Sequence, residues 1–299
     1  MKDREQKTRD RSQRGSALII TVLIVTILVA LVVEFAYEVY IDTSALSNWT
    51  NAQKASLIAK SGQTLSAKYL EEARKSLYTY EPEVELPVEK DFGADTQLII
   101  RIEDENAKFN INNIIYQGKT NDKNLLSLKK MFEYLNINPK LADVIADWID
   151  YDSEPKLPGS EDGAKNAPLW SVDELRLIPG VSKDIFDKIS PYLTIYGGDV
   201  LSYKVNINTA KLPVLISLDA KMTESLAKKI IDYRDITPFD KYEKIRGQLS
   251  ELIGITIGSS VTNKGSNFRV TTKATVNEIT RIIESVVDTS RNIQFWREE

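Results

Sequence analysis

The chain has 299 residues, of which 42% are hydrophobic and 27% charged, a composition typical of globular domains with buried cores. It contains no Cys, which excludes disulfides, thiolate metal sites and cysteine nucleophiles. It also contains no His, which excludes Ser-His-Asp and Cys-His catalysis and nearly every zinc enzyme. What remains is carboxylate, lysine, tyrosine or hard-cation chemistry, or a protein that binds without catalysing.

The N-terminal segment has the pattern of a membrane anchor. Residues 1–15 carry six Lys or Arg against three Asp or Glu, and residues 17–33 carry no charge at all. As a helix the uncharged run spans about 25 Å, close to the thickness of the hydrocarbon core. The basic flank places the N-terminus in the cytoplasm and the body on the other side. A cleaved secretory signal is the alternative, but no small-residue cleavage site follows Val33.

The helical pattern continues beyond the membrane. From Glu34 to about Leu77 there is no Pro and a single Gly, Gly62, and apolar residues recur at spacings near three, four and seven. We expect one long helix whose second half packs on the body. A membrane anchor followed by a separate core helix is the simpler alternative.

Strand patterns follow the helix and return at the C-terminus. Residues 81–91 contain two Pro and many acids, which end the helix, and residues 97–103 alternate as a strand does. Residues 267–276, 279–287 and 292–296 lie at hairpin spacing. We therefore expect a four-stranded antiparallel sheet packed on the long helix, an α+β arrangement.

A repeat occupies the middle of the chain. Residues 109–112 and 205–208 both read hydrophobic-Asn-Ile-Asn, and each opens a segment that later reads Leu-Ala-x-x-Ile-x-Asp-(Trp/Tyr)-x-Asp, at residues 141–150 and 226–235. The apolar positions of these later segments share one face of a helix. Two copies of a small helical unit are therefore expected between the first strand and the others.

The junction at residues 14–18 (Arg-Gly-Ser-Ala-Leu) resembles the processing site of type IV pilins and pseudopilins. In that family a prepilin peptidase cleaves after the Gly, here between Gly15 and Ser16, and methylates the new N-terminus. Most members have Glu as the fifth mature residue, whereas this chain has Ile20. The K-type minor pseudopilins of type II secretion characteristically lack this Glu. Since the Glu pairs with the N-terminus of the neighbour above, a subunit without it suits the filament tip.

Longer motifs resemble the same K family, in order, from about residue 14 to the C-terminus. They are residues 104–112 (DENAKFNIN), 147–155 (DWIDYDSEP), 171–181 (SVDELRLIPGV) and 205–210 (VNINTA). The resemblance implies a pilin-like α+β fold with an inserted all-α domain of two helix-hairpin-helix or SAM-like repeats. The expected parts are a leader (1–15), a transmembrane helix (16–40), a pilin-like domain in two pieces (41–108 and 236–299) and the helical insert (109–235).

The resemblance also implies a role. Such a chain is a minor pseudopilin of the type II secretion system that forms the pseudopilus tip complex with the I, J and H types. It initiates pseudopilus assembly for protein export across the outer membrane. Prepilin peptidase and the inner-membrane assembly platform are the other expected partners. The protein would span the inner membrane once, with a cytoplasmic N-terminus and a periplasmic body.

Acidic residues form the one candidate site. Asp150, Asp152 and Glu161 fall at positions 1, 3 and 12 of a loop after a predicted helix, the oxygen-ligand spacing of an EF loop. Position 6 is Pro155 where an EF loop requires Gly, so the loop is not an EF-hand. The residues alone leave open a solvated acidic loop. The K pseudopilins bind calcium, and the resemblance implies a structural calcium site at Asp150, Asp152, Glu161 and Asp162.

Alternative functions remain open at this point. The repeat also resembles helix-hairpin-helix modules, which indicates a membrane-anchored DNA-binding protein of a DNA-uptake machine. Against this, the hairpin at residues 179–182 lacks the second Gly, the one at 219–222 begins with an acid, and residues 16–299 carry a net charge of −7. A tip minor pilin of a type IV pilus is a further alternative. Paired acids could hydrolyse glycosides, but aromatic sugar platforms are scarce, so we expect no enzyme activity.

Overall fold

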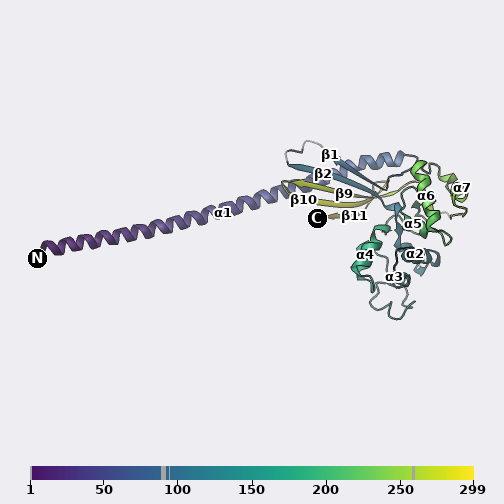
Figure 1. The fold of residues 1–299 in the computed structure, drawn as a ribbon, viewed down its shortest axis with the longest axis horizontal. Coiled ribbons are helices and arrows are strands. Elements are labelled where there is room, and N and C mark those ends of the chain that lie inside the picture. The colour runs from purple at the N-terminus through teal and green to yellow at the C-terminus, as the bar shows by residue number, and fades with distance from the viewer. Residues whose placement is uncertain (1, 89–91, 94, 258–259) are drawn as a thin grey trace.

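The computed structural model describes residues 2–88, 92–93, 95–257 and 260–299. One helix, α1 (Lys2–Lys75), projects from the body and carries the N-terminus at its far end (Figure 1). The predicted long helix is therefore confirmed as a single element. Among the described residues, α1 is the one helix long and apolar enough to cross a membrane, and residues 16–43 are exposed along it.

A five-stranded antiparallel sheet packs beside the second half of α1 (Figure 1). Its strands, in spatial order, are β1 (Glu83–Val88), β2 (Thr96–Asp104), β9 (Asn267–Val276), β10 (Ile279–Asp288) and β11 (Ile293–Glu298). The four predicted strands are present, and β1 is an additional one. Strand β1 was not predicted because the two Pro of residues 81–91 were interpreted only as the end of the helix. An edge strand nevertheless tolerates Pro, because one side of its backbone has no partner strand.

Small residues let α1 approach the sheet closely. Ala55 and Ala59 are fully buried against it, and a Cβ atom on Gly62 would lie 2.9 Å from Thr272 Cγ2 on β9. The core between the two layers contains Ile100 and Val270, both almost completely buried. The amphipathic half of α1 is thus one layer of the α+β domain, as predicted.

The helical insert lies between β2 and β9. Its elements, in chain order, are η1 (Glu105–Ala107), β3 (Phe109–Asn110), η2 (Ile111–Ile114), β4 (Ile115–Tyr116), β5 (Lys119–Thr120), α2 (Asp122–Tyr134), α3 (Leu141–Ile149), η3 (Val172–Leu177), α4 (Lys183–Ile189), η4 (Ser190–Tyr192), β6 (Leu193–Thr194), β7 (Val205–Asn206), α5 (Leu212–Ser217), α6 (Glu224–Ile236), α7 (Tyr242–Ile253) and β8 (Val261–Thr262).

The C-terminal boundary of the insert is later than expected. We placed it at residue 235, but α7 follows and its Ile245 and Leu249 are buried in the same core as α6. The core continues to Val261, so the pilin-like sheet resumes only with β9. The error arose because the repeated motif ends at Asp235, whereas the packing unit also needs the next amphipathic helix to cover its apolar face.

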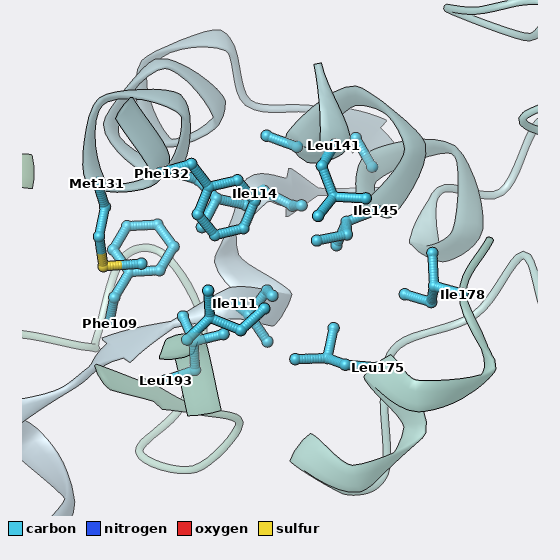
Figure 2. Packing of buried hydrophobic residues seen from close by; sticks show 14 of the residues in the cluster. Phe109, Ile111, Ile114, Met131, Phe132, Leu141, Ile145, Leu175, Ile178 and Leu193 are labelled. Carbon is cyan, nitrogen blue, oxygen red and sulfur yellow. The ribbon is translucent and has the colours of Figure 1, made fainter. Parts of the chain in front are cut away.

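Each helical unit has its own core. Figure 2 shows the first, where Phe132 of α2, Ile145 of α3, Leu175 of η3 and Leu193 of β6 converge around Ile111. The second core is built from residues of α5, α6 and α7 together with β7 and β8. The insert thus contains two separately packed hydrophobic clusters.

Matching contacts close the two units. In the first, β3 pairs in parallel with β6, and in the second, β7 pairs in parallel with β8. Asn112 exchanges two hydrogen bonds with the backbone of Leu169, Nδ2 to the carbonyl at 3.0 Å and the amide to Oδ1 at 2.9 Å. Asn208 does the same with Phe239, at 3.0 and 2.9 Å. The second Asn of each Asn-Ile-Asn motif thus ties the start of its unit to the middle.

A short polar segment joins the sheet to both units. Asp104, at the end of β2, accepts a 2.7 Å hydrogen bond from Nδ2 of Asn206 at the start of the second unit. The next residue, Glu105, accepts from the Thr194 hydroxyl at the end of the first unit and from Arg269 Nε on β9, the latter at 2.7 Å. These contacts fix the helical insert against the sheet.

Candidate metal centre

Three carboxylates meet at the C-terminal end of α3. Asp147 and Asp150 are three residues apart, so they lie on the same side of the helix end, and Glu161 reaches them from the following loop. One ligand oxygen from each side chain lies within 4.8 Å of the others. Both aspartates are fully buried and Glu161 is half-buried. The cluster is thus a concentrated negative charge removed from most of its water.

A lysine and a serine from the loop bind the same carboxylates. Lys156 Nζ lies 2.8 Å from Asp147 Oδ1 and 2.6 Å from Asp150 Oδ2. The backbone amide of Lys156 donates to Asp147 Oδ2 at 2.8 Å, and the Ser160 hydroxyl donates to the same oxygen. Two of the four aspartate oxygens therefore depend on one ammonium group.

Other oxygens in the cluster have no donor. Within the described part of the chain, Asp150 Oδ1 and both carboxylate oxygens of Glu161 are buried and accept no hydrogen bond. Burial raises the pKa of Asp150 against the opposing effect of Lys156. Burial, with the neighbouring negative charges of Asp150 and Asp147, also raises the pKa of Glu161. Both shifts record first the loss of water around these carboxylates and then the neighbouring acids.

The donor set fits a hard divalent cation. Three carboxylates face one ammonium, and the unpaired buried oxygens are ligands that Ca²⁺ and Mg²⁺ accept, whereas soft metals prefer thiolate or imidazole. A bound cation would neutralise the acids and hold the loop to the end of α3. Of the two, Ca²⁺ is more tolerant of irregular ligand geometry.

The predicted ligands are only partly brought together. Asp150 and Glu161 belong to the cluster, whereas Asp152 and Asp162 are exposed and lie outside the group of neighbouring ligand oxygens found among the described residues. Asp152 instead accepts the backbone amide of Glu154 at 2.9 Å in a local turn. Asp147 was not among the predicted ligands. Its position within the repeated motif, three residues before Asp150, was the available signal.

The loop that supplies Glu161 is specific to the first unit. In that unit, residues 150–168 separate the end of α3 from Leu169, which bonds Asn112. In the second unit only Thr237 and Pro238 separate α6 from Phe239, the matching partner of Asn208. The aspartates that correspond to Asp147 and Asp150 in the second unit are not buried as these two are. The cluster of three carboxylates therefore requires the longer loop.

The other predicted site residues lie on α1. Gly15, Ser16 and Ile20 are all helical, and the side chain of Ile20 is 56% exposed among other exposed apolar residues. Residues 16–24, which cover one helical turn on either side of Ile20, include no Asp, Glu, Lys or Arg.

The hairpin at residues 219–222 is engaged within the molecule. Its carbonyl oxygens at Asp219, Ala220 and Met222 accept hydrogen bonds from Lys130 Nζ of α2, at 2.7, 2.8 and 2.5 Å. A DNA-binding hairpin presents its backbone outward to a phosphate. Here the hairpin instead joins the second unit to the first.

Comparison with known protein families assigns this chain to one of them. Two family models, both described as "Type II secretion system (T2SS), protein K", match residues 107–198 and 205–261, which correspond to the first and second helical units. The chain belongs to the type II secretion system protein K family. Its function is that of a minor pseudopilin in this system, and the two alternatives, DNA uptake and a type IV pilus, receive no support from the comparisons.

Curated relatives agree with this assignment. The protein K of Pectobacterium carotovorum is 26% identical over 74% of this chain and 75% of its own length. That of Pseudomonas aeruginosa is 24% identical over 94% of this chain and 90% of its own. The fold resembles a chain in the crystal structure of the GspK-GspI-GspJ complex from enterotoxigenic Escherichia coli, with a TM-score of 0.61 and 15% identity. The match covers 85% of this chain and 99% of the chain in that complex.

Proposed function

We propose that this protein K caps the pseudopilus, as the tip subunit of a complex with the I, J and H types, and that it initiates assembly without any enzymatic activity. The observation that carries the proposal is the arrangement of α1, an exposed apolar rod followed by a half that packs on a pilin-like sheet. The absence of an acid at Ile20 is consistent with a subunit that has no neighbour above it.

The proposed location follows from the same helix. The apolar half of α1 spans the inner membrane, the basic N-terminus remains in the cytoplasm, and the body lies in the periplasm. Prepilin peptidase removes residues 1–15, and the assembly platform inserts the processed chain. The net charge of +3 on the leader, six basic residues against three acids, supports this orientation.

Leucines on α1 beyond the membrane support a contact with other pseudopilins. Leu57 and Leu65, eight residues apart on the same face, are 65% and 50% exposed although the opposite face is buried on the sheet. Helical neighbours in a filament can cover such residues, since apolar side chains pack where two helices run side by side. We propose that this face contacts the I-type subunit.

Copurification tests the tip complex. The full-length chain is coexpressed with the I- and J-type pseudopilins of its own secretion system and purified in detergent. A stable ternary complex is expected, and the double variant Leu57→Ser/Leu65→Ser should weaken it, whereas Leu126→Ser, at an exposed leucine on α2 of the helical insert, should not. If neither partner is retained by the unmodified chain, the proposed tip role is wrong.

The inserted domain is proposed to consist of two copies of one helical unit. The matched pairs Asn112–Leu169 and Asn208–Phe239, and the matched parallel strand pairs, support two copies of one helix-hairpin-helix or SAM-like unit. We regard the longer loop of the first copy as the part that acquired a ligand-binding role.

We propose that Asp147, Asp150 and Glu161 bind a structural calcium ion. The unpaired buried oxygens and the excess of carboxylates over ammonium support this assignment. A ligand present at about 100 times its Kd stabilises the folded state by roughly 2.7 kcal/mol. The melting temperature in CaCl₂ should therefore exceed that in EDTA.

Matched variants define the ligands. Asp150→Asn should abolish the calcium-dependent rise in melting temperature, and Asp162→Asn, on the exposed part of the same loop, should leave it unchanged. Equal melting temperatures in CaCl₂ and EDTA for the unmodified protein would contradict a calcium site.

A further inference from the structure

The side chain of Lys156 lies where a cation would bind. Its ammonium contacts Asp147 Oδ1 and Asp150 Oδ2, at 2.8 and 2.6 Å, and these side chains belong to the cluster that would hold a metal. An ammonium donates hydrogen bonds to the lone pairs that a metal ion would use. A carboxylate oxygen whose lone pairs point at Lys156 is therefore not free to complete a coordination shell of six or more oxygens.

The remaining oxygens show what the ammonium leaves unsatisfied. Asp150 is fully buried, yet its Oδ1 has no partner among the described residues, and Glu161 likewise has two buried oxygens without a donor. One positive charge faces three carboxylates here. Lys156 thus compensates the cluster incompletely, and a divalent ion would compensate it better.

The loop can release the ammonium without unfolding. The backbone amide of Lys156 donates to Asp147 Oδ2 at 2.8 Å, and the Ser160 hydroxyl donates to the same oxygen. These two contacts hold the loop to α3 independently of the Lys156 side chain, which is 26% exposed and so has a path to solvent. Rotation of one side chain is sufficient to open Asp147 Oδ1 and Asp150 Oδ2.

We propose that Lys156 is a tethered competitor for the calcium site: its ammonium occupies the site when no divalent cation is bound and leaves it when calcium binds. The proposal rests on the calcium site proposed above. The ammonium then compensates the carboxylates when calcium is absent, and it sets the calcium concentration at which the site fills. The structural calcium site thereby has a built-in threshold concentration for filling.

Amine reactivity tests displacement directly. The full-length protein in detergent is acetylated with a water-soluble N-hydroxysuccinimide ester, in EDTA or in CaCl₂, and modification of each lysine is followed by peptide mass spectrometry. Lys156 should be protected in EDTA and react faster in CaCl₂. Lys165, which pairs with Glu174 at 2.6 Å at the far end of the loop, should react equally in both.

Affinity measurements complete the test. Calorimetric titration with CaCl₂ should give a Kd about tenfold lower for Lys156→Met than for the unmodified protein, because no ammonium must be displaced. Lys165→Met should leave the Kd unchanged. Lys156→Met should also lower the melting temperature in EDTA, where the ammonium is the compensating charge of the cluster.

Two results separate the possible failures. If calcium binds but Lys156 stays protected in CaCl₂, or if Lys156→Met does not tighten binding, the competitor role is wrong and the calcium site stands. If neither the unmodified protein nor Lys156→Met binds calcium, the calcium site itself is wrong and the competitor role falls with it.

Discussion

Two adjacent buried carboxylates at the end of β2 have pKa values shifted in opposite directions because their partners differ. Burial raises the pKa of Asp104 to about 6, although neutral donors from Thr209 and Asn206 oppose the shift. Burial acts on Glu105 in the same direction, but the charges of Lys108 and Arg269 outweigh it and lower its pKa. At the junction of sheet and insert, a cation partner thus decides whether a buried acid is costly to ionise.

Asp104 makes the stability of the junction dependent on pH. Its pKa is about 6 in the folded protein and 3.8 ordinarily, so the folded state binds the extra proton between these values. Protonation of Asp104 therefore adds up to about 3 kcal/mol to the free energy of unfolding. This contribution is fully present below about pH 4 and is lost as the pH rises through about 6. The free energy of unfolding should therefore fall more between pH 4 and pH 7 in the unmodified protein than in Asp104→Asn. An identical pH dependence in both proteins would contradict the assignment.

Lys130 joins the two helical units by charge-assisted hydrogen bonds to three carbonyl groups. Lys130→Met keeps the length of the side chain but leaves these carbonyls without a donor, at an expected cost of about 1–2 kcal/mol in the free energy of unfolding. Lys228→Met removes only an exposed pair with Glu224 and should cost less than Lys130→Met. Urea denaturation compares the two, and equal losses would show that the carbonyl contacts contribute nothing specific.

At the scale of elements, the contact between α1 and the sheet depends on small residues. Ala55, Ala59 and Gly62 lie on the face of α1 that packs on the sheet, and Thr272 of β9 is fully buried beneath Gly62. A Gly inside a helix costs stability relative to Ala, so its presence here reflects the close approach of the two layers rather than helix preference.

Two glycines in helices should therefore respond oppositely to the same change. Gly62→Ala brings a Cβ to 2.9 Å from Thr272 Cγ2 and should lower the free energy of unfolding by about 1–3 kcal/mol. Gly247→Ala on α7 meets nothing within 4 Å and should raise it by about 0.5–1 kcal/mol. Melting temperatures of the two variants test this, and stabilisation by Gly62→Ala would disprove the close-packing argument.

At the scale of the molecule, one continuous helix connects the membrane to the folded body. A long insert is accommodated because it leaves the sheet after β2 and returns at β9, neighbouring strands that pair directly. The insert therefore changes the shape of the body without interrupting the layer that packs on α1.

Processing of the leader provides a test at this scale. If the leader is removed between Gly15 and Ser16 as proposed, Gly15→Leu should block cleavage and abolish secretion. Ile20→Glu should leave secretion intact, because the tip subunit has no neighbour above it. Gel mobility of the chain and the amount of exported protein in the medium give the two readouts. Normal secretion by an uncleaved Gly15→Leu chain would contradict the proposed role.

Local sequence patterns were sufficient to predict the bounds of an element where that element determines its own structure. The strand at residues 267–276 was predicted with the observed bounds, and α1 ends two residues before the predicted Leu77. Patterns failed where a neighbour decides. The edge strand β1 forms only because β2 offers it a partner, and α7 belongs to the insert only because the second core requires a cover.

The amino-acid sequence alone was sufficient to predict the long apolar helix, the alternating strands and the protein K family, because periodicity and motif order are properties of the chain itself. The membership of the carboxylate cluster was decided by tertiary structure. Asp147 and Glu161 are far enough apart along the chain that only the end of α3 and the return of the loop bring their oxygens together, while Asp152 and Asp162 turn to solvent. Spacing along a chain specifies a ligand set only when the intervening backbone has a known path.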